Sequence, residues 1–519
     1  MRPLQHFHRV LSDGEVEQLH EAACSLLGDP GMRLQNQALL EALRRKGAVV
    51  DFGAEVARFP RGLIEETIRI ASAEERERRK AARKPADEAR EPAPAASELD
   101  YPDQLTFSWH TPFRNRTPPV QASIGGGAPM FYDHERKANR YATRDDFLAT
   151  IRLAEGLPEV VTMGNGVHYL KEPDGSDVPP KMVAVKGAAL VALHSTKPGC
   201  TSIIDRRQLP YLMELGAIAL GSPEAYLRNP ILVNIHDTES PLRLTRPEAA
   251  IIEDMARARL SIFILPMLLA GISSPVYPIA AAITTAAEIL GVWAAVKALR
   301  QDCPVEARSV SGVLNPATGA ASFAAPETVL IDLAVAQLFR ERYGLPCGTG
   351  VGLIDSPVPG PLSIFERTFK AFSSSLAGEP SFPVGIIGGA VVFSPEQVLL
   401  DLDIAATQVQ LLGGIGGEHF EESLGLIREK GIGGLYLDTE HTARHFRDCL
   451  MLPKVFTRLK STDVGNARAH DPVELSHRRY REILEANPLT TIDEQRAQAV
   501  ERVVQDAGKA LASIRGATE

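Results

Sequence analysis

Polar side chains follow several short apolar runs of this chain, and such groups can act on a substrate where strand ends converge. The set comprises Asn165, His168, Asp205, His236, Asp237, Arg308 and Asp355. Asp355 and His236 could serve as an acid–base pair, whereas Arg308 could bind an anion. Each also has a structural interpretation, since Asp205 could cap the next helix and His236 could begin a polar turn. These residues would converge at the open end of a barrel. We therefore expect the set as a whole, more than any single member, to form a functional site.

The segment from Gly350 to Glu366 is the most informative of these candidates. It follows the short apolar run Tyr343–Cys347 and ends inside a helical pattern. That order places it on a loop at the carboxyl end of a strand, where an α/β barrel keeps its catalytic groups. The segment contributes two carboxylates, Asp355 and Glu366, to the predicted site.

Motifs for metal or phosphate binding are missing from the sequence. It contains no HExxH motif, no CxxC pair and no glycine-spaced calcium loop, so no metal is expected. His441 and His445 could share a helix face, but no Glu lies between them, and a structural helix is the preferred interpretation. Three glycine-rich stretches, 125–127, 348–352 and 413–417, lack the Lys-Ser/Thr of a phosphate-binding loop and are interpreted as tight turns or close backbone packing.

The scaffold for these residues is indicated by strand-like and helix-like segments that alternate from about residue 145. The predicted strands are Val160–Met163, Cys200–Ile204, Ile231–Ile235, Leu260–Leu265, Val305–Val310, Leu345–Cys347, Pro383–Ile387 and Gly434–Leu437. The predicted helices between them are Lys181–His194, Gln208–Leu220, Pro247–Ala258, Ala280–Arg300, Glu327–Tyr343, Ile364–Ser375 and Pro395–Leu411. Eight strands that alternate with helices favour an α/β fold of the (β/α)8 TIM-barrel type over an open doubly wound sheet.

Four regions are predicted along the chain. Residues 1–72 form a helical N-terminal module, whose first helix begins at the capping-box pattern Ser12–Glu15. Residues 73–98 are a charged, Pro/Ala-rich stretch, interpreted as a solvated helix end followed by a linker, with a docking arm as the alternative. Residues 99–465 form the TIM-barrel catalytic domain, and residues 466–519 a C-terminal helical extension.

Composition limits the class of protein. The net charge of −9 argues against a nucleic-acid partner. Five scattered cysteines form no CxxC pair, which is typical of a reduced, cytoplasmic protein. The N-terminus lacks the apolar core of a signal peptide, and apolar runs such as Leu260–Ile272 are too short and interrupted to span a bilayer.

Several segments together carry a family resemblance that extends from about Leu11 to Ala512. They are the N-terminal helix pair, Gly125–Pro129, Tyr132–His134, Ala142–Phe147 with Ala154–Pro158, Ser240–Arg243, Asn315–Gly319 with Ala325–Glu327, Tyr343–Cys347 and His441–Phe446. Their order and spacing resemble the trimethylamine methyltransferase (MttB-like) superfamily. The resemblance implies a TIM barrel that moves a methyl group from a methylated amine to cob(I)alamin, a corrinoid carried by a partner protein. We therefore expect a corrinoid-binding partner, no membrane partner and a homo-oligomer.

The 350–366 loop keeps the frame of the family loop but not all of its polar residues. In relatives the loop resembles Gly-Leu-Thr-Asp-Ala/Ser-Lys-x-Pro-Asp-x-Gln, and founding members carry pyrrolysine there. Here Pro357 stands at the lysine or pyrrolysine position, and Gly360 and Leu362 replace the Asp and Gln. Proline offers no side-chain nucleophile, so pyrrolysine chemistry is excluded. The chain is identified as a divergent, non-pyrrolysine member.

The resemblance suggests roles for the remaining candidates. A quaternary amine leaves as a neutral amine, so the site mainly has to orient the methyl carbon. Asp355 and Glu366 are the expected catalytic carboxylates that face the cation. The expected substrate-binding residues are His236, Arg308, Trp109, Tyr132, Tyr277 and Pro357, with Arg308 pairing with a substrate carboxylate and the aromatic rings forming cage walls.

Two other classes of function stay open from the sequence. A TIM-barrel lyase or hydrolase could use Asp355 with His236 and would need no cobalamin. A non-catalytic protein that binds quaternary amines or a corrinoid protein would explain the loss of polar residues from the loop.

Overall fold

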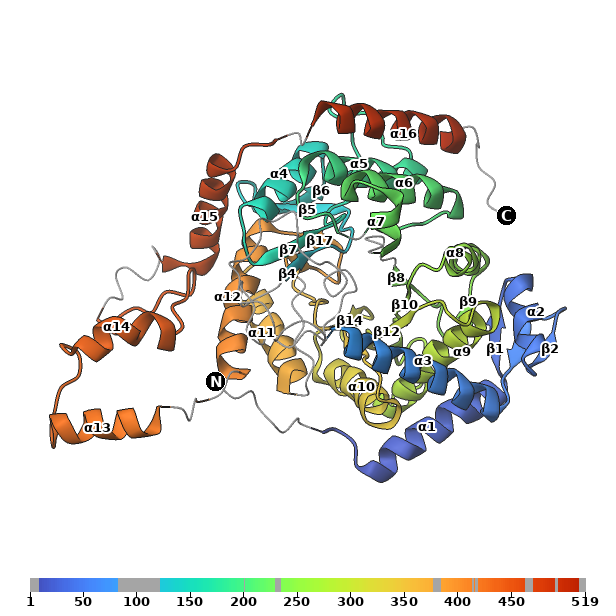
Figure 1. The fold of residues 1–519 in the computed structure, drawn as a ribbon, viewed down its shortest axis with the longest axis horizontal. Helices are drawn as coiled ribbons and strands as arrows, with labels where there is room; N and C mark the ends of the chain where they lie inside the picture. Colours follow the sequence, from blue (N-terminus) through green and yellow to red (C-terminus); the bar gives the residue numbers. More distant parts are fainter. Residues whose placement is uncertain are drawn as a thin grey trace.

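The computed structural model describes residues 9–82, 122–199, 201–228, 235–376, 384–412, 415, 419–462, 470–490 and 493–512 (Figure 1). Trp109 and residues 83–98 of the predicted linker lie outside the described residues, as do Cys200, part of the Ile231–Ile235 strand and the start of the Pro383–Ile387 strand. The helices are α1 (Asp13–Gly28), α2 (Gln37–Arg45), α3 (Arg61–Ala82), α4 (Arg144–Glu155), α5 (Val183–His194), α6 (Leu209–Leu220), α7 (Pro223–Arg228), α8 (Arg246–Arg257), α9 (Pro278–Leu299), α10 (Pro326–Gln337), α11 (Pro361–Leu376), α12 (Pro395–Leu412), α13 (Phe420–Lys430), α14 (Glu440–Cys449), α15 (Pro472–Ala486) and α16 (Glu494–Ala512).

The strands are short and form several small sheets. They are β1 (Met32–Leu34), β2 (Val49–Asp51), β3 (Val56–Arg58), β4 (Ala122–Ile124), β5 (Met130–Asp133), β6 (Ala138–Tyr141), β7 (Val160–Met163), β8 (Ile235–His236), β9 (Arg243–Leu244), β10 (Ile262–Ile264), β11 (Leu269–Ala270), β12 (Val305–Ser309), β13 (Gly312–Leu314), β14 (Ala321–Ser322), β15 (Gly348–Thr349), β16 (Ile386–Ile387) and β17 (Val392–Phe393).

The N-terminal region contains strands as well as helices. The capping box at Ser12 and Glu15 is confirmed, because the side chain of each residue accepts a hydrogen bond from the backbone N–H of the other. Strands β1, β2 and β3 form a sheet that β9 extends in parallel. The three helices predicted for this module are present, and short strands that were not predicted lie between them. Strands of three residues give too short a pattern to be recognised without their partners.

Helix α9 is the central packing element of this half of the molecule. It packs against α1, α2, α3 and α10 (Figure 1). Among the described helices it alone is long and apolar enough to cross a membrane by length and composition, but 83% of its apolar window is buried. Its apolar surface is thus used in the core, where burial of each large side chain contributes about 1.5–3 kcal/mol.

Parallel strands give the molecule its α/β character. Strands β8, β10, β12 and β15 lie side by side in parallel, and β4 pairs in parallel with β7. The intervening helices α8, α9 and α10 match their predicted ranges closely. Among the described residues the paired strands do not close into a ring. The predicted eighth strand, Gly434–Leu437, was wrong, because these residues lie in an irregular connection between α13 and α14.

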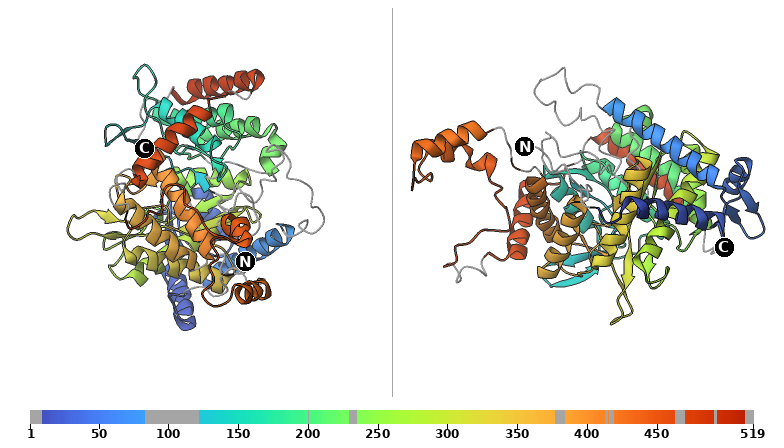
Figure 2. Two further views of the ribbon diagram at one scale, coloured as in Figure 1. Left: turned by 90° about the vertical axis from the view of Figure 1, so that its left-hand side faces the viewer. Right: turned by 90° about the horizontal axis from the view of Figure 1, so that it is seen from below.

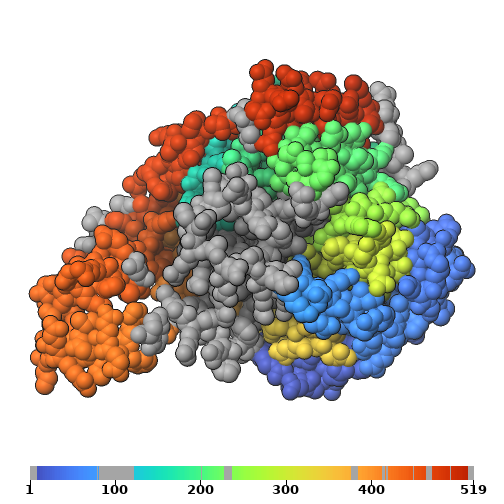
Figure 3. All heavy atoms as spheres, viewed as in Figure 1, coloured from blue at the N-terminus to red at the C-terminus, as the bar shows by residue number. Residues whose placement is uncertain are grey.

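The C-terminal helices cover the outside of the α/β body. Helix α15 packs on α12, and α16 lies across α5 and α6, as Figures 1 and 2 show. Both were predicted from the sequence. Helices α13 and α14 instead project away from the body, which the space-filling view shows as a separate orange lobe (Figure 3). Helix α13 buries none of its side chains.

Close packing of α9 against the N-terminal module predicts a stability effect at Gly291. A Cβ atom there would lie 2.8 Å from Met32 Sδ and 3.0 Å from Leu27 Cδ2. Gly291→Val should therefore lower the free energy of unfolding by about 1–3 kcal/mol. Gly508→Val, in α16 with nothing within 4 Å, should change it by less than about 0.5 kcal/mol. Urea unfolding of both variants measures the difference, and equal midpoints would contradict the packing.

Candidate functional site

Three loops meet around Asp355: the β14–α10 turn, the β15–α11 loop that contains Asp355, and the β16–β17 turn. The Asp355 carboxylate joins the first two. Its oxygens accept hydrogen bonds from the Ser322 hydroxyl and from the backbone N–H groups of Phe323 and Ala324. Those residues close the β14–α10 turn, whereas Asp355 lies on the loop between β15 and α11. The predicted cation-facing role does not fit this geometry, because three donors already occupy the carboxylate. Asp355 acts here as a positioning group.

Lys370 of α11 forms hydrogen bonds to the same two loops. It is 2% exposed, and its ammonium group donates to the carbonyl oxygens of Phe323 and Leu353. Burial lowers the pKa of Lys370 to about 8. Asp355 thus binds backbone N–H groups and Lys370 binds backbone C=O groups of one pair of loops. These charge-assisted bonds satisfy polar backbone atoms that would otherwise be left without partners.

Glu366 fixes the shape of the candidate loop itself. Its Oε2 accepts hydrogen bonds from the backbone N–H groups of Asp355 and Ser356, both at 2.9 Å. Burial raises the pKa of Glu366, and the charge of Asp355 adds to the rise. The side chain is 6% exposed. Like Asp355, it therefore orients the loop through the backbone instead of presenting an oxygen to a cation.

The β16–β17 turn and the β5–β6 hairpin support the loop from the other side. Gly388 and Gly389 adopt the left-handed backbone region, with φ of 59° and 64°, and donate to the carbonyl oxygens of Ser356 and Ile354. Asn139 Nδ2 donates to the Pro357 carbonyl at 2.9 Å, while the Pro357 ring is exposed. Tyr132 is 5% exposed and packs in a cluster with Ile354. It is a buried support for the loop and not an open cage wall.

Strand register decides which polar residues of the parallel sheet share a face. Phe263 lies opposite both Ile235 and Glu306, and Arg308 lies opposite Gly348. The printed register ends at the row of His236, Ile264 and Ala307, and its continuation by one residue places Asp237, Leu265 and Arg308 in the next row. The hydrogen bond from Leu265 N to His236 O at 3.0 Å supports this continuation. Asp237 and Arg308 are thus two strands apart on one face, or about 10 Å.

His236 lies on the opposite face, against the covering helices. It is fully buried, its Nδ1 pairs with Glu248 of α8, and its Nε2 lies 3.3 Å from Met255 Sδ. Ser309, on the same face, donates to Asp332 of α10 at 2.8 Å. Successive residues of a strand point to opposite faces, so His236 points toward the helices and Asp237 points away from them. The structure does not bring His236 and Asp355 together as an acid–base pair.

Asp237 was predicted only as one of the polar residues that follow the strands, with no separate role. The residue is exposed at the strand end, yet nearby protein displaces enough water to raise its pKa to about 6, with Glu248 adding to the rise. The turn after it is held by Glu288 of α9, which accepts from Thr238, from Ser240 and from the backbone N–H of Leu242. The Ser240–Arg243 motif therefore positions the end of β8.

Arg308 is buried on the parallel sheet, whereas Tyr277 is exposed at the start of α9. The Arg308 guanidinium lies over the Phe263 ring, 5.5 Å from its centroid, and the residue is 7% exposed. Tyr277 is 72% exposed at the start of α9, beside exposed Val276 and Ile279. It belongs to an apolar rim and not to a closed cage.

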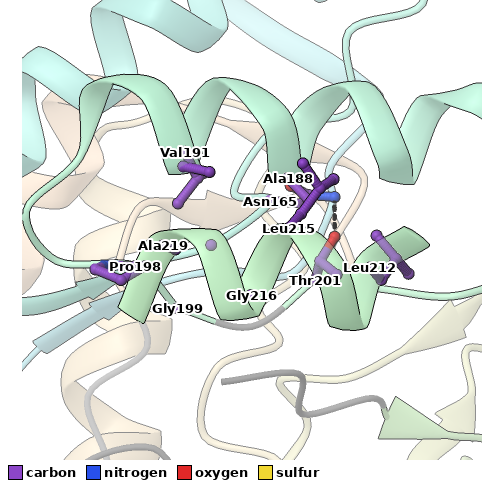
Figure 4. A pocket seen from close by; sticks show the side chains of 12 residues that line it. Asn165, Ala188, Val191, Pro198, Gly199, Thr201, Leu212, Leu215, Gly216 and Ala219 are labelled. Atoms are coloured by element: carbon purple, nitrogen blue, oxygen red, sulfur yellow. Dashed lines mark hydrogen bonds between the residues drawn. The ribbon is translucent and has the colours of Figure 1, made fainter. Parts of the chain in front are cut away.

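A small cavity lies elsewhere, between α5 and α6 and the end of β7. Asn165 and Thr201 point into it and share a hydrogen bond (Figure 4). Most of the other lining residues are apolar or glycine, and the space has room for about one water molecule. It is too small for an amine substrate. The groups of described side chains whose spacing could hold a metal ion include no residue of the three loops around Asp355.

Some of these roles had a sequence signal and others had none. Period-two alternation after the apolar run at Ile235 could have separated Asp237 from His236, but the register was needed to say which faces the helices. Lys370 gave no signal, because a lysine inside an amphipathic helix is normally solvated.

Comparisons with known proteins point in one direction. Residues 120–510 match the family described as trimethylamine methyltransferase (MTTB). The chain is 23% identical over 447 residues to the trimethylamine methyltransferase MttB of Desulfitobacterium hafniense, covering 84% of this chain and 81% of that protein. It is 22% identical to the glycine betaine methyltransferase of another strain of that species, covering 92% of each. A solved structure, the monomethylamine methyltransferase of Methanosarcina barkeri, is 14% identical and covers 72% of this chain and 73% of that chain with a TM-score of 0.37.

The hydrogen bonds of Asp355 predict that Asp355→Asn loosens the loops. The asparagine amide group would place a donor against at least one backbone N–H, so the free energy of unfolding should fall by about 1–3 kcal/mol. Hydrogen exchange should also quicken in residues 322–324 and 353–358. Asp177→Asn, an exposed carboxylate outside these loops, is the matched control. Unchanged exchange in Asp355→Asn would contradict the positioning role.

Proposed function

The chain belongs to the trimethylamine methyltransferase (MTTB) family, and on that premise we propose that it transfers a methyl group from a quaternary amine that also bears a carboxylate. The acceptor in this proposal is cob(I)alamin on a separate corrinoid protein. The family assignment supports methyl transfer from methylated amines, and the narrower substrate class comes from the geometry of the strand ends.

The row formed by Asp237, Leu265 and Arg308 carries the proposal. It offers a negative group and a positive group on one face, about 10 Å apart, with an apolar side chain between them. A betaine has the complementary pattern of an onium group and a carboxylate a few bonds apart. The Asp237 carboxylate would face the onium group, and the Arg308 guanidinium would pair with the carboxylate. Leu265 would contact the apolar part between them.

The proposed methyl transfer requires little acid–base catalysis by the protein. The bond between the methyl carbon and nitrogen breaks, and its electron pair stays on nitrogen, which leaves as a neutral tertiary amine. The corrinoid, when docked, supplies a Co(I) nucleophile that takes the methyl group. Fixing both ends of the substrate orients one N-methyl carbon, and such orientation is worth several kcal/mol of the barrier. Pro357 needs no reactive side chain in this scheme.

The partner must reach the strand ends, and the structure leaves an apolar rim there. Tyr277, Val276 and Ile279 are exposed beside the β11–α9 connection, and Leu362 and Phe365 are exposed on the first turns of α11. Exposed apolar residues around a site are typical of protein-docking surfaces. We propose that the parallel strands belong to a (β/α)8 barrel and that a corrinoid protein docks on this rim. The cytoplasmic location and the homo-oligomer expected from the sequence also remain proposals.

A substrate panel with free cob(I)alamin tests the function. The purified chain should demethylate carboxylate-bearing quaternary amines in preference to tetramethylammonium, because only the former engage Arg308. Arg308→Gln should lower kcat/KM for the betaines about 10- to 100-fold, through loss of a charge-assisted bond, and change tetramethylammonium turnover less than about 3-fold. Arg502→Gln, an exposed arginine on α16, is the control. Absence of methyl transfer with the whole panel would overturn the proposal, and binding without turnover would indicate a non-catalytic binder.

The raised pKa of Asp237 predicts a pH dependence of substrate binding. An acid whose pKa is raised to about 6 loses its negative charge as the pH falls through 6, well above the usual range for Asp. The KM for a quaternary amine should therefore rise below about pH 6, by up to tenfold per pH unit. Asp237→Asn should have a high KM with no such dependence. A wild-type KM that stays constant from pH 7 to pH 5 would contradict the role of Asp237.

A further inference from the structure

Two histidines and a glutamate from distant parts of the sequence meet beside the β5–β6 hairpin. His134 follows β5, Glu396 lies in the first turn of α12, and His477 lies in α15. One ligand atom from each lies within 4.8 Å of the others. His134 Nδ1 is 3.8 Å and His477 Nδ1 is 2.8 Å from Glu396 Oε1. We propose that these three side chains bind one zinc-class divalent cation that fastens the C-terminal extension to the body of the protein.

The donor set suits such a cation. Two imidazole nitrogens and one carboxylate oxygen form a three-ligand set for tetrahedral Zn²⁺. Bond lengths of about 2.0–2.1 Å place neighbouring ligand atoms about 3.3 Å apart in a tetrahedron. The two distances to Glu396 Oε1, 2.8 and 3.8 Å, lie on either side of that value. Side-chain shifts of about half an ångström would equalise them.

A buried nitrogen without a partner is the observation that singles out this cluster. The His134 side chain is 5% exposed, and its Nδ1 has no hydrogen-bond partner among the described residues. Leaving a buried polar atom unsatisfied costs about 1–3 kcal/mol. The atom faces Glu396, which is 1% exposed. A cation between them would satisfy the nitrogen and balance the buried carboxylate.

Outer carboxylates complete the pattern of a metal-binding histidine pair. His134 Nε2 lies 3.2 Å from Glu474, and His477 Nε2 lies 3.2 Å from Glu135. A ligating histidine usually donates its second ring N–H to such a carboxylate, which fixes the tautomer. Ser394 Oγ also donates to Glu396 Oε2 at 2.7 Å, which leaves Oε1 to face the histidines.

Two features must adjust when the ion binds. The two imidazole rings are stacked with centroids 3.9 Å apart, and their lone pairs lie in the ring planes, so one ring must tilt. His477 is the one free to do so, because its side chain is 17% exposed on the outer helix. Lys137 Nζ lies 2.8 Å from His134 Nε2 and must lose this contact when the ion binds. It can keep its contact with Glu474, at 2.9 Å. Lys137 is 56% exposed and can move.

Two other groups of described side chains have the spacing of metal ligands but not these features. In the group around His20, both imidazole nitrogens already have partners, Tyr343 and Glu65. The group of Glu422, His441 and His445 on the projecting helices is wholly exposed. These residues include the histidine pair for which the sequence favours a structural helix, and they supply a matched control.

The location gives the ion a structural consequence. His134 follows Tyr132 on β5, and Tyr132 packs against Ile354 of the candidate loop. Joining His134 to α12 and α15 would therefore stiffen the small sheet that supports that loop. The role is positional, because none of the three residues contacts the loop's hydrogen-bond network directly.

Zinc binding to the full-length chain tests the proposal without any activity assay. After treatment with a chelator and dialysis, the protein should take up one Zn²⁺ per chain and melt at a higher temperature. Glu396→Gln and, separately, His477→Gln should each weaken zinc affinity at least tenfold and abolish the shift in Tm. Glu474→Gln should weaken it about 10-fold, as loss of an outer carboxylate does. His445→Ala should leave it unchanged.

Two outcomes would overturn the site. The first is a wild-type chain that shows no saturable zinc binding. The cluster would then be a hydrogen-bond network without a metal ion. The second is binding that His445→Ala removes and Glu396→Gln retains. Circular dichroism of the zinc-free variants, and a Co²⁺ absorption spectrum that reports tetrahedral coordination in the wild type, separate loss of a ligand from loss of folding.

Discussion

Opposite charges on Asp355 and Lys370 hold the loops at the strand ends together. The carboxylate accepts from backbone N–H groups of residues 323 and 324, and the ammonium group donates to the carbonyls of Phe323 and Leu353. A loop inside a protein must satisfy its polar backbone atoms without regular sheet partners. These two side chains meet that constraint, and Glu366, Asn139 and the β16–β17 turn bond further backbone atoms of the same loop.

The same constraint changes how the 350–366 loop is understood chemically. Polar residues in a loop after a strand can contact the substrate or hold the loop in place. The Asp355 carboxylate, which accepts three hydrogen bonds, holds the loop in place. In the proposed function, the charges that contact the substrate come from the strands themselves. Asp237 and Arg308 lie on the face away from the helices, and their spacing fits a zwitterion better than a simple cation. Family membership supports a methylated amine as the methyl donor, and the narrower class that we propose rests on the sheet register.

The proposed ion site extends this dependence to the C-terminal helices. Helix α15 reaches the β5–β6 hairpin through His477, and that hairpin supports the candidate loop through Tyr132 and Asn139. An ion bound there would couple the C-terminal extension to the loop through packed side chains. The projecting pair α13 and α14 takes no part in this network, because its side chains are largely exposed.

The sequence by itself determined the α/β class and the limits of most helices, and it singled out the 350–366 loop as the candidate site. Those features follow from local signals, such as the capping box at Ser12 and the long run of apolar residues in α9. Tertiary structure alone decided that His236 faces the helices while Asp237 does not, since a shift of one residue reverses every side chain of a strand. It also brought together His134, Glu396 and His477, because contacts across hundreds of residues leave no local pattern.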